Sequence, residues 1–190
     1  MTDFLVKVDR SITPANFSFP QPFNVAVPFI DRHIQENRGE RIAIQSANQT
    51  VTYGFLAEQV NRCGNALLNQ GITSGDRLMM IVKDTPAFFY LFWGAIKAGV
   101  IPVPVNTLLR VDDYAFMIEK TACQALCYSS EYMDEIEPAT VKSRHKPHVV
   151  LVEGTSNHQS ISLESVMESA SPELLPFPAT EHDDCFWLFS

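Results

Sequence analysis

Several sequence motifs that usually mark catalytic or ligand-binding sites are absent from this sequence of 190 residues. The eight glycines stand singly, with neither GxGxxG after a strand-like run nor GxxxxGKS/T, so no phosphate-binding loop is indicated. No serine lies in a GxSxG turn, and the five histidines show no HExxH or comparable metal-ligand spacing. The four cysteines form no CxxC pair, which argues against a zinc site or a dithiol redox centre.

Basic residues and long apolar runs are also scarce. Fourteen lysines and arginines stand against 22 aspartates and glutamates, giving a net charge of −8, and this balance excludes a typical nucleic-acid-binding surface. The most apolar stretch, residues 85–96, falls short of the roughly 20 residues that span a bilayer. The first ten residues lack the basic and apolar regions of a signal peptide. We therefore expect a soluble cytoplasmic protein with neither nucleic-acid nor membrane partners.

The composition is otherwise that of a folded protein, with 46% hydrophobic and 19% charged residues. At roughly 100–200 residues per domain, the length predicts one domain whose core needs no metal or disulfide. Cys63, Cys123 and Cys127 have apolar neighbours and are predicted to be buried thiols.

Residues 1–25 and 26–190 differ in pattern. Pro14, Pro20 and Pro22 predict that residues 1–25 form an extended arm lying over a surface. Apolar periodicities of 3.6 and 2 alternate from residue 26 onward. The expected helices are 24–37, a helix between Thr52 and Gly71, 86–98, 111–121, 130–137 and 163–170. The expected strands are 41–45 and 50–53 as a hairpin, then 77–82, 100–105, 124–128, 148–152 and 185–189.

Strands that alternate with helices imply right-handed crossovers. The predicted fold class is therefore α/β, with a mainly parallel sheet and helices on both faces. Five aromatic residues at helical spacing are interpreted as a helix packed on all sides rather than as a ligand-binding box. They are Phe88, Phe89, Tyr90, Phe92 and Trp93. Asp112 and Asp113 fall at a helix start, where capping explains them without catalysis.

Two segments resemble the core motifs of the AMP-forming acyl-CoA synthetases, the superfamily that includes luciferases and adenylation domains. Residues 51–56 (VTYGFL) resemble the first motif, and residues 95–106 (AIKAGVIPVPVN) resemble the second at the right distance downstream. The lead-in at residues 71–77 (GITSGDR) lies between them. Residues 23–31, 92–99, 106–109 and 186–190 resemble in particular the benzoate–CoA ligases, and the similarity covers about residues 20–190.

The resemblance implies that residues 26–190 are the N-terminal subdomain of a ligase whose phosphate loop follows position 190. The implied reaction joins an aryl carboxylate to CoA, with ATP, Mg and CoA used by the parent enzyme. The pocket and catalytic residues would lie beyond this chain, so it is expected to act as a scaffold, to be inactive alone and to hold no cofactor. Its partner would be the remainder of the parent ligase.

One position, Lys97, matches the place where some aryl-CoA ligases present a basic residue to a phosphate of CoA. The alternative is a solvated lysine that complements the helix dipole. Other functions also stay open: a fragment of a fatty-acyl-CoA ligase or of an amino-acid adenylation domain, or a non-catalytic module that self-associates as a homodimer through an exposed apolar patch.

Overall fold

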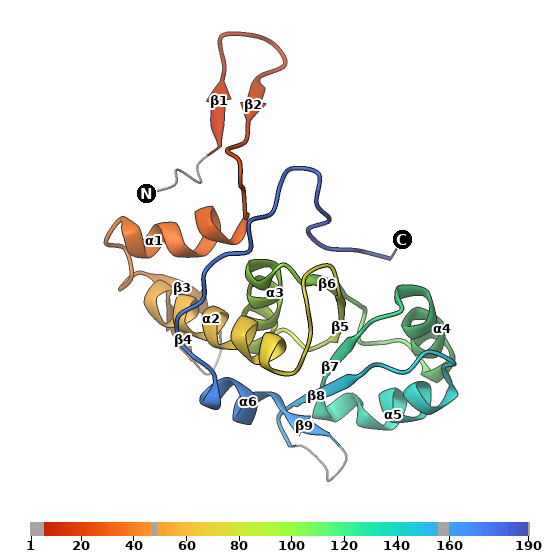
Figure 1. The fold of residues 1–190 in the computed structure, drawn as a ribbon. Helices are drawn as coiled ribbons and strands as arrows, with labels where there is room; N and C mark the ends of the chain where they lie inside the picture. Colours follow the sequence, from red (N-terminus) through yellow and green to blue (C-terminus); the bar gives the residue numbers. More distant parts are fainter. Residues whose placement is uncertain (1–5, 47–48, 156–159, 190) are drawn as a thin grey trace.

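A computed structural model describes residues 6–46, 49–155 and 160–189. Its centre is a sheet of five strands in the order β6-β5-β7-β8-β9, in which every neighbouring pair is parallel (Figure 1). The strands are β5 (Arg77–Ile81), β6 (Ile101–Pro104), β7 (Ala125–Ser129), β8 (Val149–Glu153) and β9 (Ile161–Ser162). The predicted α/β class with a parallel sheet is confirmed.

Helices cover both faces of the sheet, as predicted. One face carries α2 (Tyr53–Asn69), α3 (Pro86–Ala98) and α6 (Leu163–Ser169), and the other carries α4 (Val111–Thr121) and α5 (Met133–Lys142). Alternate residues of β5 divide between the two faces, because successive strand side chains point in opposite directions. Leu78 and Met80 pack in the first core, while Met79 and Ile81 pack in the second.

The boundaries of α2 and α3 follow the local signals in the sequence. Thr52 caps α2, because its hydroxyl accepts a hydrogen bond from the Phe55 amide at 3.3 Å. α3 begins at Pro86 and ends before Gly99, whose φ of 81° is a conformation that glycine adopts most easily. The two helices cross closely, since a Cβ atom on Gly94 would lie 2.9 Å from the backbone nitrogen of Gly64.

The N-terminal part of the body holds short elements that pack against α2. The predicted helix at 24–37 is present as η1 (Val27–Asp31), a turn of π-helix, followed by α1 (Arg32–Gln35). The predicted hairpin is present as the antiparallel pair β3 (Ile42–Gln45) and β4 (Thr50–Thr52). Part of its turn, residues 47–48, lies outside the described residues.

The N-terminal arm expected at residues 1–25 does not run as one extended segment through residues 7–18. They form an antiparallel hairpin of β1 (Lys7–Asp9) and β2 (Asn16–Ser18), which projects away from the body (Figure 1). The prolines do not prevent this pairing, because Pro14 lies in the connection and the other two lie after β2. The chain then rejoins the body, where the Phe23 amide donates to the Ala179 carbonyl at 2.6 Å.

The predicted strand at 185–189 is also absent, and only one backbone hydrogen bond, from Trp187 N to Pro102 O at 3.1 Å, joins it to the sheet. Ile101 and Val105 direct their amides toward β5, so Pro102 and Pro104 face outward and offer no N–H group. The outer edge of β6 therefore cannot complete a ladder from its own donors.

Smaller differences between the predicted and the observed elements occur where the sequence pattern is short or weak. β9 has only two residues and gives no readable alternation. The helix expected to end at 137 starts as the turn η2 (Ser130–Tyr132) and continues through Pro138 to Lys142. Burial of Ile136 and Ala139 against the sheet outweighs the local preference for a stop.

The buried cysteines generate a prediction about thiol reactivity. Burial raises the pKa of Cys63 to about 12 and also raises the pKa values of Cys123 and Cys127, so little thiolate forms near pH 8. We expect a disulfide reagent to label only Cys185 rapidly in the native chain, because it alone is partly exposed. The other three thiols should react at the rate of unfolding.

The control is Cys185→Ser, which should abolish the rapid phase and leave the slow phase unchanged. Rapid native-state labelling of more than one thiol would contradict the burial described here.

Candidate functional site

The candidate site residue Lys97 lies in the last turn of α3 and is 3% exposed. Its ammonium group donates to Asp31 Oδ1 and to Asn61 Oδ1, both at 2.7 Å. Asp31 belongs to η1 and Asn61 to α2, so a single cation joins three elements. The alternative interpretation of Lys97 as a solvated lysine is therefore wrong.

Asn61 extends this polar cluster to a segment far along the chain. Its amide group donates to the Pro172 carbonyl at 2.8 Å, and one helical turn later the Asn65 amide group donates to the Ser171 and Glu173 carbonyls at 2.9 and 2.8 Å. These bonds hold residues 170–180, which we call the strap, along α2. The predicted loop at 171–180 is confirmed, and it is held to the body by side chains.

Asn24 fixes the other end of the strap. It is 2% exposed, and its amide group donates to the carbonyls of Ile96 and Phe177 at 3.0 and 3.1 Å. The Phe177 amide in turn donates to the Lys97 carbonyl at 2.8 Å. The last carbonyls of α3 thereby find donors that the helix itself cannot supply. Asn24 and Asn61 are not predictable from the sequence, because a single asparagine that bonds to distant backbone carbonyls leaves no periodic signal.

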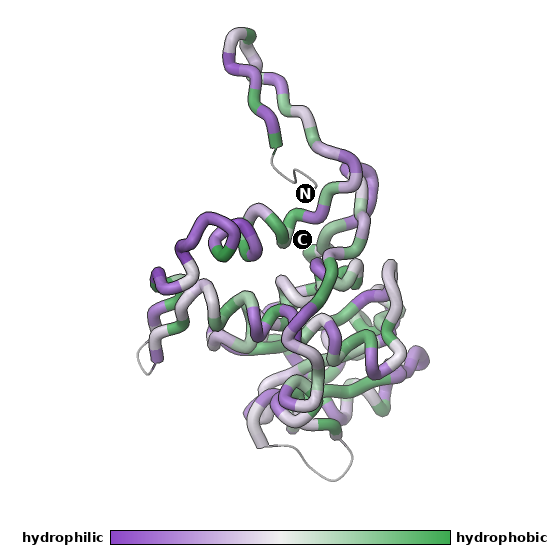
Figure 2. Tube along the Cα trace, turned by 60° about the vertical axis from the view of Figure 1, so that its left-hand side comes forward, coloured by the Kyte–Doolittle hydropathy of each residue, from purple (hydrophilic) through white to green (hydrophobic). Residues whose placement is uncertain are grey.

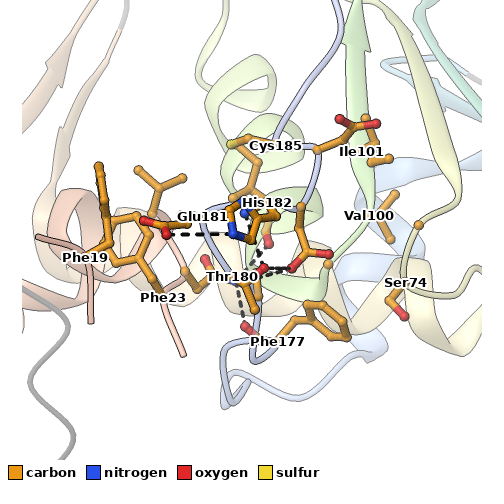
Figure 3. A pocket seen from close by; sticks show the side chains of 18 residues that line it. Phe19, Phe23, Ser74, Val100, Ile101, Phe177, Thr180, Glu181, His182 and Cys185 are labelled. Carbon is orange, nitrogen blue, oxygen red and sulfur yellow. Dashed lines mark hydrogen bonds and ion pairs between the residues drawn. The ribbon is translucent and has the colours of Figure 1, made fainter. Parts of the chain in front are cut away.

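A hollow of about 770 Å³, which we call the strap groove, opens at the C-terminal end of α3 (Figure 3). Phe19 and Phe23 line it from the segment after the hairpin, and Phe177 lines it from the strap. Glu181 and Asp184 follow the strap at its rim. The strap groove thus combines aromatic walls with negative charge.

A second hollow, of about 870 Å³, opens beyond the C-terminal ends of β5 and β8, where open α/β sheets commonly bind ligands. Its acidic lining residues are Asp84, Glu153, Glu164 and Glu168. Among the lining residues that the structure describes, Arg62 is the only basic one, and its guanidinium is engaged with Glu58 at 2.9 Å. The described residues therefore do not fit the phosphates of ATP here.

No group of three or more histidine, cysteine or acidic side chains in the described part of the chain could hold a metal ion. Nor does any helix there combine the length and apolar character needed to cross a membrane.

The aromatic residues of α3 divide between packing and exposure. Phe88, Tyr90 and Phe92 pack against the first core, and Tyr90 and Trp93 pack against a further core cluster on α2, so the predicted packing role is confirmed for these four. Phe89 is 40% exposed, so α3 is not packed on all sides. Phe88 and Phe92 stack with ring centroids 6.1 Å apart, and Phe92 lies 5.6 Å from the Phe186 ring. The close crossing with α2 favours small residues on that side of α3. We call the rings of Phe88, Phe89, Phe92 and Phe186 the aromatic face.

The fold is an open parallel α/β domain with helices on both faces of its sheet. Residues 30–190 match the family model described as AMP-binding enzyme. The chain belongs to the AMP-binding enzyme family. Sequence and structural relatives agree with this assignment.

The chain is 33% identical over 183 residues to the benzoate–CoA ligase of Thauera aromatica, a match that covers 96% of this chain and 34% of that protein. It is 32% identical over 168 residues to the 4-hydroxybenzoate–CoA/benzoate–CoA ligase of Rhodopseudomonas palustris, covering 88% of this chain and 31% of that one. A crystal structure of a benzoate CoA ligase from Burkholderia xenovorans superimposes with a TM-score of 0.76 and 30% identity. That match covers 87% of this chain and 32% of the ligase, so this chain spans about a third of its relatives' length.

The polar cluster generates a prediction about stability. Lys97→Met should lower the free energy of unfolding by about 3 kcal/mol, because it leaves the Asp31 carboxylate without its cation. The matched control is Lys142→Met, which removes an exposed pair with Asp112 and should cost less than about 1 kcal/mol. Urea unfolding of both variants checks this, and equal losses would contradict a special role for the buried cation.

Proposed function

We propose that the whole protein is an AMP-forming aryl-CoA ligase that converts benzoate, ATP and CoA to benzoyl-CoA, AMP and pyrophosphate. The observation that carries this proposal is the similarity to ligases whose names specify benzoate and hydroxybenzoate, which extends over nearly all of this chain. ATP and Mg would be bound by parts of the whole protein other than the residues described here.

We propose a scaffold role for the chain itself. Residues 1–25 form its N-terminal arm and residues 26–190 an N-terminal subdomain, whose sheet and strap place the segment after residue 185 against β6. The observation that supports the role is that the chain spans about a third of its relatives' length.

The remainder of the whole protein is the proposed partner of the aromatic face. Its exposed rings, together with the 67% exposed Leu188, form an apolar surface of the kind that domains bury against each other. A cytoplasmic location is proposed from the cysteines, because all four are free thiols and disulfides are rare in reducing compartments.

A fatty-acyl-CoA ligase or an amino-acid adenylation enzyme is the second candidate, because the motif-like segments at 51–56 and 95–106 resemble features shared across the superfamily. A screen of the whole protein with benzoate, a medium-chain fatty acid and free amino acids distinguishes the candidates. Preference for the fatty acid or for an amino acid would overturn the aryl assignment.

The scaffold role predicts that the 190-residue chain alone forms no benzoyl-CoA from benzoate, ATP and CoA. The physical reason is that no described hollow offers the cations and oriented amides that phosphoryl and acyl transfer require. A thioester assay by chromatography, with the whole protein as the positive control, measures this. Sustained turnover by the chain alone would refute the scaffold role.

The contact of Lys97 with a phosphate of CoA is a further proposal for the whole protein. An ammonium group has three donors, and Asp31 and Asn61 account for two of them within the described residues. The third is then the donor for a phosphate oxygen. We expect Lys97→Ala to raise the KM for CoA about tenfold, a loss of roughly 1.4 kcal/mol, with the KM for benzoate unchanged.

Asp31→Asn is the matched control, because it removes the ion pair and keeps the ammonium group. An unchanged KM for CoA in Lys97→Ala, or the same increase in both variants, would exclude the contact.

A further inference from the structure

The hairpin of β1 and β2 projects away from the rest of the described residues (Figure 1). Its strands pair only with each other, and every residue in both strands is exposed. An isolated two-stranded hairpin is marginally stable in water. A hairpin of this kind therefore needs a surface to pack against.

The side chains of the hairpin are suited to such a surface. Phe17, Ile12 and Val8 are 57%, 53% and 41% exposed, and apolar and polar stretches alternate along the hairpin (Figure 2). Aromatic and arginine side chains are the types most enriched in protein interfaces. Three large apolar groups thus stand among the eleven exposed residues of the segment 7–18.

The hairpin also carries positive charge on an acidic chain. Lys7 and Arg10 form none of the ion pairs observed among the described residues. Asp9, the one acidic residue of residues 6–19, is engaged locally, accepting hydrogen bonds from the Ser11 amide and hydroxyl at 2.9 and 2.6 Å. Its two cations are thus available to an acidic partner surface.

The strap groove has the complementary character. Its aromatic walls suit the apolar side chains, and its rim carries Glu181 (Figure 3). The Glu181 side chain is 43% exposed, and its one observed partner is the exposed His182 at 3.8 Å. Asp184 also lines the groove, but its carboxylate accepts a hydrogen bond from Trp187 Nε1 at 3.2 Å. The Glu181 carboxylate is therefore the group that the rim offers to Lys7 and Arg10.

We propose that the hairpin docks in the strap groove of a second copy of this chain. Its own groove is a poor target, because the hairpin leaves the body at Phe19 and Phe23, which form one wall of that groove, and it points away. Exchange between two copies fills both grooves reciprocally, as a two-fold dimer requires.

The experiment is analytical ultracentrifugation of the 190-residue chain over about a hundredfold range of concentration, in which mass action reveals a dimer. Phe17→Ser should raise the dimer dissociation constant at least tenfold. Phe116→Ser is the matched control, since this 54% exposed phenylalanine lies on α4, away from both surfaces, and should leave the constant unchanged.

A charge exchange tests the register of the contact. Arg10→Glu and Glu181→Arg should each weaken the dimer, and the double variant should recover most of the lost affinity. All substituted side chains are exposed, so urea unfolding should show unchanged midpoints and confirm that the variants fold.

Three outcomes would overturn the proposal. They are a monomer at every concentration, a dimer that responds equally to the two serine variants, and a double variant no tighter than the single ones. A dimer weakened only by Phe89→Ser would overturn it as well, because association would then occur through the aromatic face.

Discussion

The buried ammonium group of Lys97 is the interaction on which the arrangement of this chain depends. A charge that is 97% removed from solvent is tolerated only when oxygen atoms replace its water, and here they come from Asp31 and Asn61. These three residues belong to α3, η1 and α2, so the helices can pack only in the geometry that brings the oxygens together. Asn61 then passes the constraint to the strap, and Asn24 secures the strap's far end.

The elements that are predictable from the sequence have capping or helix-breaking residues at their ends, or a strong apolar periodicity. Pro86 and Gly99 delimit α3, Thr52 opens α2, and alternation of strands with helices gave the parallel sheet. The failures have a different origin. The hairpin at residues 7–18 depends on how that segment folds back on itself, and the missing strand at 185–189 depends on which way Pro102 and Pro104 face. The latter is a tertiary property that no window of sequence contains.

The candidate site likewise combines a residue that is recognisable in the local sequence with partners that only the tertiary structure reveals. Lys97 was identified by its place in a motif, yet its partners Asp31 and Asn61 lie 66 and 36 residues away and carry no signal of their own. Within residues 95–106 the small residues approach the sheet, Lys97 binds η1 and α2, and Gly99 admits the Phe177 ring, which a Cβ atom would meet at 2.5 Å. The motif by which the family resemblance was seen thus encodes supporting structure in this chain.

The outward edge of β6 affects the tendency of the chain to aggregate, both during folding and once folded. An exposed strand edge normally acts as a template on which other chains polymerise into cross-β aggregates. Pro102 and Pro104 leave that edge with carbonyl groups alone, so an incoming strand finds acceptors but no donors and gains only half of its hydrogen bonds. The Pro102 carbonyl on this edge still accepts a hydrogen bond from the Trp187 amide of its own chain. Aggregation by addition of further strands at this edge is suppressed.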